Sequence, residues 1–224
     1  LIFVNKPAGL SMHPAKESFS GKNPDEKFLT DFLLGSFPEI KKVGDEPEFR
    51  PGLVHRLDKN TSGLVVVARN QETFEILKNI FKNRLVEKKY LAVVCGIPKN
   101  KEGIINLPIG RSVNNPLKRA VEQGRNKVRG AKEAVTEYRV LVSGLKYSLL
   151  ELKPKTGRMH QIRVHLKSLG TPVACDAVYG GQNVCCPGEV GRQLLHAKSL
   201  SFIYPIGKNL DFEADPPEEF FKTK

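Results

Sequence analysis

Asp58 is the residue of this chain whose neighbours best suit it to chemistry. Arg56 precedes it by two positions, and residues 61–63 form a Thr-Ser-Gly turn directly after it. The apolar run at residues 64–68, Leu-Val-Val-Val-Ala, is typical of a buried strand. A polar loop anchored by a core strand is a suitable place for a catalytic carboxylate. The local pattern by itself favours a simpler role for Asp58, an Asx-turn or cap that organises the turn after it.

The elements that must position this loop are mostly strands. Residues 52–68 are predicted to form a strand, a loop and a second strand. Further strands are expected at residues 1–4, 90–95, 103–109, 134–141 and 147–152, and helices at 27–34, 72–84 and 161–169. Because strands dominate without regular alternation with helices, we expect an α+β fold with a mixed or antiparallel sheet, rather than a Rossmann-like fold.

Three segments are predicted to lie outside these elements. Residues 43–51 are charged and contain proline, which is typical of a loop. Residues 114–132 are strongly basic and lack periodicity, so we expect a mobile loop. The residues after Leu210 are acidic and contain proline, and they predict a surface tail. The apolar residues of the predicted helix at 27–34, Phe32 among them, are expected to share one buried face.

Composition indicates a polyanionic partner. The chain has 224 residues, of which 40% are hydrophobic, and its formal net charge is +12. This charge favours nucleic acid first and an anionic membrane second, with general solubility as the simpler explanation. The sequence contains no run of 18 apolar residues, so no membrane-spanning helix is expected, and no secretory signal is visible.

The four cysteines do not form a metal-binding motif. Cys95 lies in an apolar run and is expected to be a small core residue. Cys185 and Cys186 are adjacent in a Gly/Pro loop, and no Cys-x-x-Cys pair exists, so a zinc site is not expected. A reducing compartment is the default expectation for such a chain. Nothing in the sequence explains the vicinal pair.

Five motif blocks in a fixed order make the chain resemble the RluA-type pseudouridine synthases. Residues 55–63 read His-Arg-Leu-Asp-Lys-Asn-Thr-Ser-Gly, the signature block of that family. Residues 5–10 (Asn-Lys-Pro-Ala-Gly-Leu) with His13-Pro14 resemble its first block, and residues 89–94 (Lys-Tyr-Leu-Ala-Val-Val) its tyrosine block. Residues 156–166 (Thr-Gly-Arg-Met-His-Gln-Ile-Arg-Val-His-Leu) resemble its arginine block, and residues 195–197 (Leu-His-Ala) its closing strand.

The resemblance implies both a fold and an activity. It implies an α+β fold with a mixed, mostly antiparallel sheet, flanking helices and a central cleft. Residues 1–224 would form one catalytic domain, with a small N-terminal RNA-binding domain absent or removed. The activity would be isomerisation of uridine to pseudouridine in a stem-loop of ribosomal RNA or, as second choice, transfer RNA. Neither cofactor nor metal is expected, and the protein would be a cytoplasmic monomer.

The resemblance also assigns catalytic roles. Asp58 would be the nucleophile, and Arg163 would pair with it and keep it ionised, because a lone buried carboxylate has a raised pKa. Tyr90 would stack on the base and remove the proton from carbon 5, while Ile162 would press on the uracil ring. The alternative for Arg163 is a surface arginine on the helix face of Lys167. Tyr90 would otherwise be an ordinary strand residue, and Ile162 an ordinary core residue.

Arg56, Arg158 and His160 are expected to contact the substrate. On an extended segment, Arg56 and Asp58 point to the same side. Arg56 would fill the space of the flipped nucleotide, and the alternative is a phosphate contact. The motif histidines have no nucleophile or metal-ligand spacing, and we interpret them as structural hydrogen-bonding residues: His55, His160, His165 and His196. Asp176, near Tyr179 and Gly180, is expected to be structural, and Cys175 stands where we expect a glycine.

Two rival functions remain. A glycoside hydrolase normally needs two carboxylates that flank the bond, and the motif blocks supply only Asp58. A non-catalytic RNA-binding protein of the same fold is the other rival. It is disfavoured because loss of function would be expected to remove Asp58, Tyr90 or Arg163 first.

Overall fold

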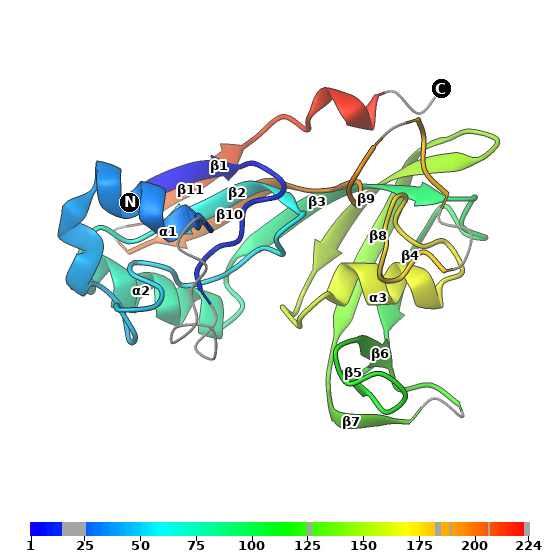
Figure 1. Ribbon diagram of the computed structural model, residues 1–224, viewed down its shortest axis with the longest axis horizontal. Coiled ribbons are helices and arrows are strands. Elements are labelled where there is room, and N and C mark those ends of the chain that lie inside the picture. The colour runs from blue at the N-terminus through cyan, green and yellow to red at the C-terminus, as the bar shows by residue number, and fades with distance from the viewer. Residues whose placement is uncertain (15–25, 125–126, 182–184, 189, 206, 222–224) are drawn as a thin grey trace. The chain divides into compact units, whose positions relative to one another are not determined.

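The computed structural model describes residues 1–14, 26–124, 127–181, 185–188, 190–205 and 207–221 of the 224-residue chain. These residues form two compact units, coloured along the chain in Figure 1. Unit 1 comprises Leu1–Val86 and Ser199–Ala214, and unit 2 comprises Glu87–Lys198 and Asp215–Lys224.

Unit 1 is built on strands. β1 (Ile2–Lys6) and β2 (Ser62–Val67) pair antiparallel. β10 (Leu195–Tyr204), which belongs to this unit from Ser199 onward, forms an antiparallel pair with β11 (Lys208–Glu213). Every residue of β2 is buried, as its run of apolar, mostly β-branched residues predicts.

The helices of unit 1 are α1 (Leu29–Ser36), the 3₁₀ helix η2 (Pro38–Lys42) and α2 (Gln71–Lys82). The side chain of Asn70 caps α2 by accepting a hydrogen bond of 2.8 Å from the backbone N–H of Thr73. The helix predicted at residues 72–84 is confirmed as α2, which begins one residue earlier and ends two residues earlier than predicted.

The main sheet of unit 2 has the strand order β3-β9-β8-β4, and all neighbouring strands are antiparallel. The strands are β3 (Glu87–Cys95), β9 (Tyr147–Pro154), β8 (Val135–Ser143) and β4 (Glu102–Asn106). Burial alternates along β9, so one face of this strand carries the core.

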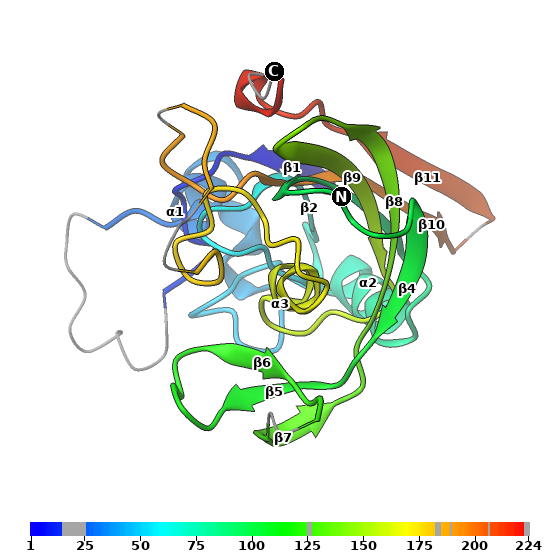
Figure 2. The ribbon, with the colours of Figure 1, turned by 90° about the vertical axis from the view of Figure 1, so that its right-hand side faces the viewer.

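α3 (Gln161–Ser168) covers the buried face of this sheet. Ile162 and Leu166 of the helix pack with Ala92, Leu150 and Leu152 of the strands. Figure 2 shows the helix end-on, inside the curve of β9, β8 and β4. The sheet and the helix together hold the arginine block at the core of unit 2.

A second, smaller sheet occupies the segment that was predicted to be a mobile basic loop. β5 (Ile109–Ser112) lies between β6 (Arg119–Val121) and β7 (Val128–Lys132). Gly110 allows the close approach, because a Cβ there would lie 2.6 Å from the Val128 side chain. The prediction of a loop at residues 114–132 is therefore wrong for β6 and β7, because the local pattern did not reveal their pairing with β5. Arg125, counted among the basic residues, lies outside the described residues.

Three other expectations need correction. Residues 52–57 form no strand beyond a single bridge at Leu53, because Gly52 makes a turn with φ +70°. Phe32 is 57% exposed and does not join the buried face of α1. The C-terminal segment is more than a surface tail, since it contains β11 and the 3₁₀ helix η3 (Glu218–Phe220). Phe220 is buried, with 3% of its surface exposed.

The expected fold class is confirmed: the chain is a mixed α+β protein with mostly antiparallel sheets. Among the described residues, no helix is long and apolar enough to cross a membrane.

Candidate active site

The Asp58 loop lies directly before β2 in unit 1. Leu57 is buried, whereas Arg56 is exposed and Asp58 is half-buried. This alternation agrees with an extended segment on which Arg56 and Asp58 share a side. The backbone N–H of Thr61 donates to the carbonyl of Asp58 over 3.0 Å and closes the turn. The turn that the local pattern predicts is thus present, and it leaves the Asp58 side chain at the edge of the unit's core.

A buried lysine ties this loop to the N-terminal motif block. The side chain of Lys6 is fully buried, and its Nζ donates to the carbonyls of Pro7, Leu10 and Lys59 over 2.8, 2.8 and 3.0 Å. The backbone N–H of Gly9 donates to the same Lys59 carbonyl over 3.0 Å. Lys6 therefore fixes the backbone immediately after Asp58, a role that the sequence analysis missed.

Two histidines of unit 1 also support this region. The backbone N–H of Val66 donates to His55 Nε2 over 3.0 Å, and the imidazole stacks on Phe81 at 4.6 Å between ring centroids. His55 is thus a structural hydrogen-bonding residue, as predicted. Burial and then the positive charge of Arg56 lower the pKa of His13, against the opposing effect of its contact with the Pro14 carbonyl.

Tyr90 and Ile162 lie together in unit 2. Tyr90, in β3, is half-buried and packs against the core cluster that contains Ile162, which is 6% exposed. Ile162 therefore does pack in the core, as the simpler alternative held. The tyrosine and the isoleucine thus belong to the same apolar region of unit 2.

The arginine block is anchored by Gln161 at the start of α3. The side-chain amide of Gln161 donates to the Val135 carbonyl and to Thr136 Oγ1, both over 3.0 Å. Its carbonyl oxygen accepts from Thr156 Oγ1 and from the backbone N–H of Arg158 over 2.7 and 2.9 Å. The buried glutamine thus fastens the block to β8, a role that the motif alone did not reveal.

Arg158 and His160 lie shortly before Gln161 in the chain. Arg158 is half-buried, and its Nε donates to the carbonyl of Glu133 over 2.9 Å. His160 adopts a left-handed backbone with φ +57° at the start of α3, and its Nδ1 lies 2.8 Å from the Tyr179 hydroxyl. His160 thus makes a hydrogen bond within unit 2, as its structural interpretation predicts, and its expected contact with the substrate stays a prediction.

Arg163 is buried, with 4% exposure, so the alternative of a surface arginine is wrong. Its Nε and Nη2 donate to the two carboxylate oxygens of Asp176 over 2.7 and 2.9 Å. Burial pushes the pKa of Asp176 upward, but Arg163 and two backbone N–H groups outweigh it and lower that pKa. Asp176 is more than a turn residue; the only signal in the sequence was one acidic residue in a small, apolar segment.

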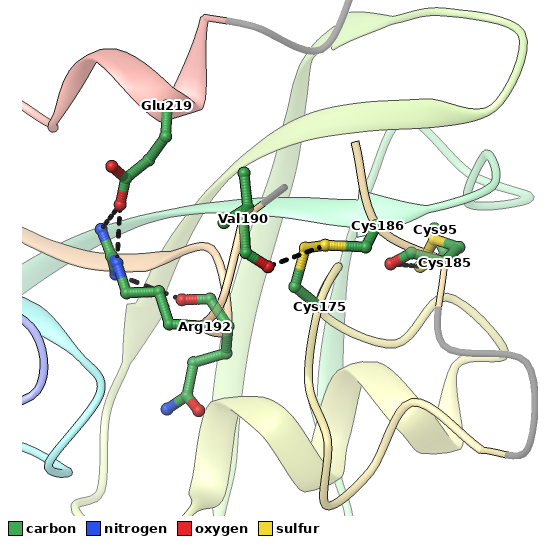
Figure 3. Close-up of a disulfide and its surroundings, with 8 residues drawn as sticks. Cys95, Cys175, Cys185, Cys186, Val190, Arg192 and Glu219 are labelled. Atoms are coloured by element: carbon green, nitrogen blue, oxygen red, sulfur yellow. Dashed lines mark hydrogen bonds and ion pairs between the residues drawn. A yellow bond between two sulfur atoms is a disulfide. The ribbon is translucent and has the colours of Figure 1, made fainter. Parts of the chain in front are cut away.

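The four cysteines form two disulfides in unit 2 (Figure 3). Cys95 is bonded to Cys185, with 6.0 Å between Cα atoms, and Cys175 is bonded to Cys186, with 4.6 Å. Cys95 does pack against a core cluster of unit 2, as expected, but as one half of a disulfide. The default expectation of a reducing compartment does not agree with the two disulfides. Cys175 has φ +59°, the backbone conformation that glycine favours, which explains why a glycine was expected there.

Several basic residues lie on or beside the small sheet of unit 2. The exposed ones are Arg111, Lys127, Arg129 and Lys132. Lys118 and Arg119 are half-buried, and the Lys118 Nζ donates to the Val178 carbonyl over 3.0 Å. The described residues contain no group of three or more His, Cys, Asp or Glu side chains that could hold a metal ion.

Comparison with known proteins shows what kind of protein carries this site. Residues 1–168 match the family model of the RNA pseudouridylate synthases. The chain belongs to this family. It is 38% identical, over 98% of its length, to an uncharacterized RNA pseudouridine synthase of Bacillus subtilis, and it covers 67% of that protein. It is 40% identical over 99% of its length to the ribosomal large subunit pseudouridine synthase D of Neisseria meningitidis serogroup B, and covers 57% of it.

Solved structures agree with this assignment. Human RNA pseudouridylate synthase domain containing 1 matches with a TM-score of 0.75 and 27% identity over 96% of this chain and 79% of that one. Human RNA pseudouridylate synthase domain containing 4 matches with a TM-score of 0.73 and 28% identity, over 98% of this chain and 87% of the human one. This RNA pseudouridylate synthase chain therefore has the fold of its family.

The predicted site residues divide between the two units. Arg56 and Asp58 lie on one loop of unit 1, whereas Tyr90, Ile162 and Arg163 lie within unit 2. Within unit 2, the structure adds Asp176 to Arg163 and Gln161 to the start of α3.

Proposed function

We propose that this chain isomerises uridine to pseudouridine in RNA, with Asp58 as the nucleophile. The observation that carries the proposal is the placement of Asp58, in a chain of the RNA pseudouridylate synthase family. Its half-exposed carboxylate follows an exposed arginine, on a loop whose backbone is fixed by the buried Lys6. A substrate-accessible carboxylate on a rigid loop is what a nucleophile requires.

The reaction exchanges one bond of the nucleoside for another. The bond between the sugar and the base nitrogen breaks, the base rotates, and a bond forms between the sugar and carbon 5. The proton on carbon 5 is removed, with Tyr90 as its proposed acceptor, and the ring nitrogen released from the sugar takes up a proton, so that the product is an isomer of the substrate. Asp58 would act by attack on the sugar, by attack on carbon 6 of the base, or in an elimination. The reaction needs no cofactor in any of these routes.

Unit 2 would supply the cation and the surface for the base. We propose that Arg163 keeps Asp58 ionised and therefore nucleophilic, because arginine stays protonated under all relevant conditions. We propose that the flat face of uracil packs on Tyr90 and Ile162, which belong to the same apolar region of unit 2.

Arg56 would replace the uridine in the RNA helix. The target carbons are inaccessible inside a base stack, and flipping a nucleotide costs a few kcal/mol. The exposed Arg56 has a planar head group that can stack in the vacated space. Arg158 and His160 would contact the flipped nucleotide or its neighbours.

Ribosomal RNA is the proposed substrate, with transfer RNA second. Several similar proteins are named ribosomal large subunit pseudouridine synthase D. The formal charge of +12 and the exposed basic residues of the small sheet suit an RNA stem-loop. We propose that the chain acts as a cytoplasmic monomer.

The test is to incubate the protein with ribosomal RNA fragments and with transfer RNA, and to quantify pseudouridine by mass spectrometry. The wild-type chain should form pseudouridine, and Asp58→Asn should form none while keeping its thermal melting temperature. Asp45→Asn, which removes an exposed carboxylate from the same unit, is the matched control and should retain full activity.

The same assay separates the rivals. A hydrolase would release free uracil, and a non-catalytic binding protein would bind RNA and leave its uridines unchanged. Pseudouridine formation by Asp58→Asn at a substantial fraction of the wild-type rate would exclude the proposed mechanism.

A further inference from the structure

Asp176 holds the guanidinium of Arg163 through both of its carboxylate oxygens. The carboxylate is fully buried, and its two oxygens accept from Nε and Nη2 of Arg163 over 2.7 and 2.9 Å. Such bidentate pairing fixes the plane of the guanidinium as well as its position. Of the five N–H groups of Arg163, the pair engages one on Nε and one on Nη2.

The carboxylate is itself held by the backbone. One oxygen of Asp176 also accepts from the N–H groups of Val178 and Tyr179 over 2.9 and 3.0 Å. The Gly180 N–H donates to the Asp176 carbonyl over 2.7 Å. Asp176 therefore cannot swing away from Arg163 without breaking the turn that follows it.

Tyr179 supports the arginine from another direction. Its ring lies 5.0 Å from Cζ of Arg163, within the range of a cation–π contact. Its hydroxyl lies 2.8 Å from His160 Nδ1 and accepts a hydrogen bond of 3.0 Å from the backbone N–H of Arg119. The turn at residues 176–180 thus presents Arg163 with a carboxylate and an aromatic ring that are both anchored elsewhere.

We propose that Asp176 is a positioning residue for the isomerisation and acts through Arg163. The proposal rests on the proposed function of this chain, in which Arg163 is the counter-ion of the nucleophile. An arginine side chain has many accessible rotamers, so an untethered Arg163 would sample many placements. The bidentate pair selects one of them before RNA binds.

Asp176→Asn tests this idea, because it keeps the shape of the side chain and removes its charge. With saturating enzyme, at a temperature where the variant is folded, we expect the single-turnover rate to fall about 100-fold, the loss that a displacement of 1 Å can cause. The dissociation constant for RNA should stay within twofold, whereas a purely structural defect would lower the folded fraction and weaken RNA binding together.

Glu219→Gln is the matched control. It removes the carboxylate from another ion pair of unit 2, that of Arg192 and Glu219, whose Nε to Oε1 distance is 2.7 Å. We expect its single-turnover rate to equal that of the wild type. If Asp176→Asn fails to fold, Asp176→Glu keeps the charge and displaces the fork by one methylene, and it should show a similar loss.

A double-mutant cycle distinguishes positioning from general support. Lysine at position 163 keeps a cation but cannot form the fork, so Asp176→Asn should cost far less in an Arg163→Lys background than in the wild type. Equal losses in both backgrounds, or a wild-type rate in a folded Asp176 variant, would overturn the inference. Absence of any pseudouridine with the wild-type protein would instead reject the proposed function.

Discussion

The Asp58 loop and the Asp176 turn are both organised around a fully buried charge, and the two charges have opposite signs. In unit 1, the Lys6 ammonium donates to three backbone carbonyls, one of them from the residue after Asp58. In unit 2, the Asp176 carboxylate accepts from the Arg163 side chain and from two backbone N–H groups.

The difference lies in what each charge holds. A lysine is a compact point charge that suits several carbonyl oxygens, so Lys6 fixes the backbone of the loop that carries Asp58. A carboxylate matches the planar fork of arginine, so Asp176 fixes a side chain. A loop whose backbone must stay fixed is thus held through its main chain, whereas a long side chain such as Arg163 is held through its head group.

Arg163→Met should have the largest effect, because it removes both the proposed counter-ion of Asp58 and the partner of Asp176. Breaking a buried ion pair costs about 3–5 kcal/mol, and we expect that loss in the free energy of unfolding together with loss of most activity. Urea unfolding and pseudouridine formation measure the two effects. Normal activity at neutral pH would remove Arg163 from the site.

Lys6→Met should destabilise the protein somewhat less. It leaves three carbonyl groups in partly buried surroundings without this donor. An unsatisfied buried group costs about 1–3 kcal/mol, and less where water or local relaxation replaces the bond. We therefore expect a loss of about 2–4 kcal/mol in urea unfolding. Lys59→Met is the control, because its exposed side chain is not the group that accepts from Lys6. Equal stability of both variants would mean that Lys6 does not hold the loop.

Reduction of the disulfides should affect unit 2 alone, because all four cysteines belong to it. The Cys175–Cys186 bond spans 11 residues, and closing a loop of that size stabilises a protein by about 3 kcal/mol in the chain-entropy description. Dithiothreitol should lower the melting temperature and increase hydrogen exchange in unit 2 peptides. The Cys175→Ser, Cys186→Ser double variant should respond less to the reductant. Equal responses of the two units would contradict this assignment.

The sequence predicted the parts of this molecule whose signal is local. The helix α2 and the hairpin of β8 and β9 were found because their apolar residues repeat with the right period. The short strands β6 and β7 are charged and lack alternation. They exist because they pair with β5 and because Val121 and Ile109 pack with Val164 and Tyr179, contacts that a local pattern does not contain.

For the candidate site, too, the sequence predicted the residues that have a local signal and missed the contacts that only the fold creates. The motif blocks identified Asp58, Tyr90 and Arg163 as candidates and placed Arg163 on a helix. They did not reveal the partner of Arg163, since Asp176 is 13 residues away and meets it only through the fold. The Cys95–Cys185 bond escaped for the same reason, because its ends are 90 residues apart.

The smallest expected effect concerns pH and compares a fully buried histidine of unit 2, His165, with a half-buried histidine of unit 1, His13. His165, in unit 2, is fully buried, and its Nδ1 and Nε2 lie 2.9 Å from Thr136 Oγ1 and 3.0 Å from the Leu107 carbonyl. Burial lowers its pKa below the ordinary value of 6.5, although the Leu107 carbonyl opposes the shift. Thr136 Oγ1 already accepts from Gln161, so its hydroxyl is suited to donate to a neutral imidazole.

Because the folded pKa of His165 is lowered, the unfolded chain binds the proton first as the pH falls below about 6.5. Stability from this group is therefore complete above that pH and is lost progressively below it. We expect the free energy of unfolding to fall by about 1.4 kcal/mol for each pH unit over which only the unfolded chain carries this proton. His165→Gln should remove much of the slope between pH 7 and 5. His13→Gln should remove less, because His13 is only half-buried. Urea unfolding at a series of pH values measures both variants, and an unchanged slope in His165→Gln would show that other groups control the acid limb.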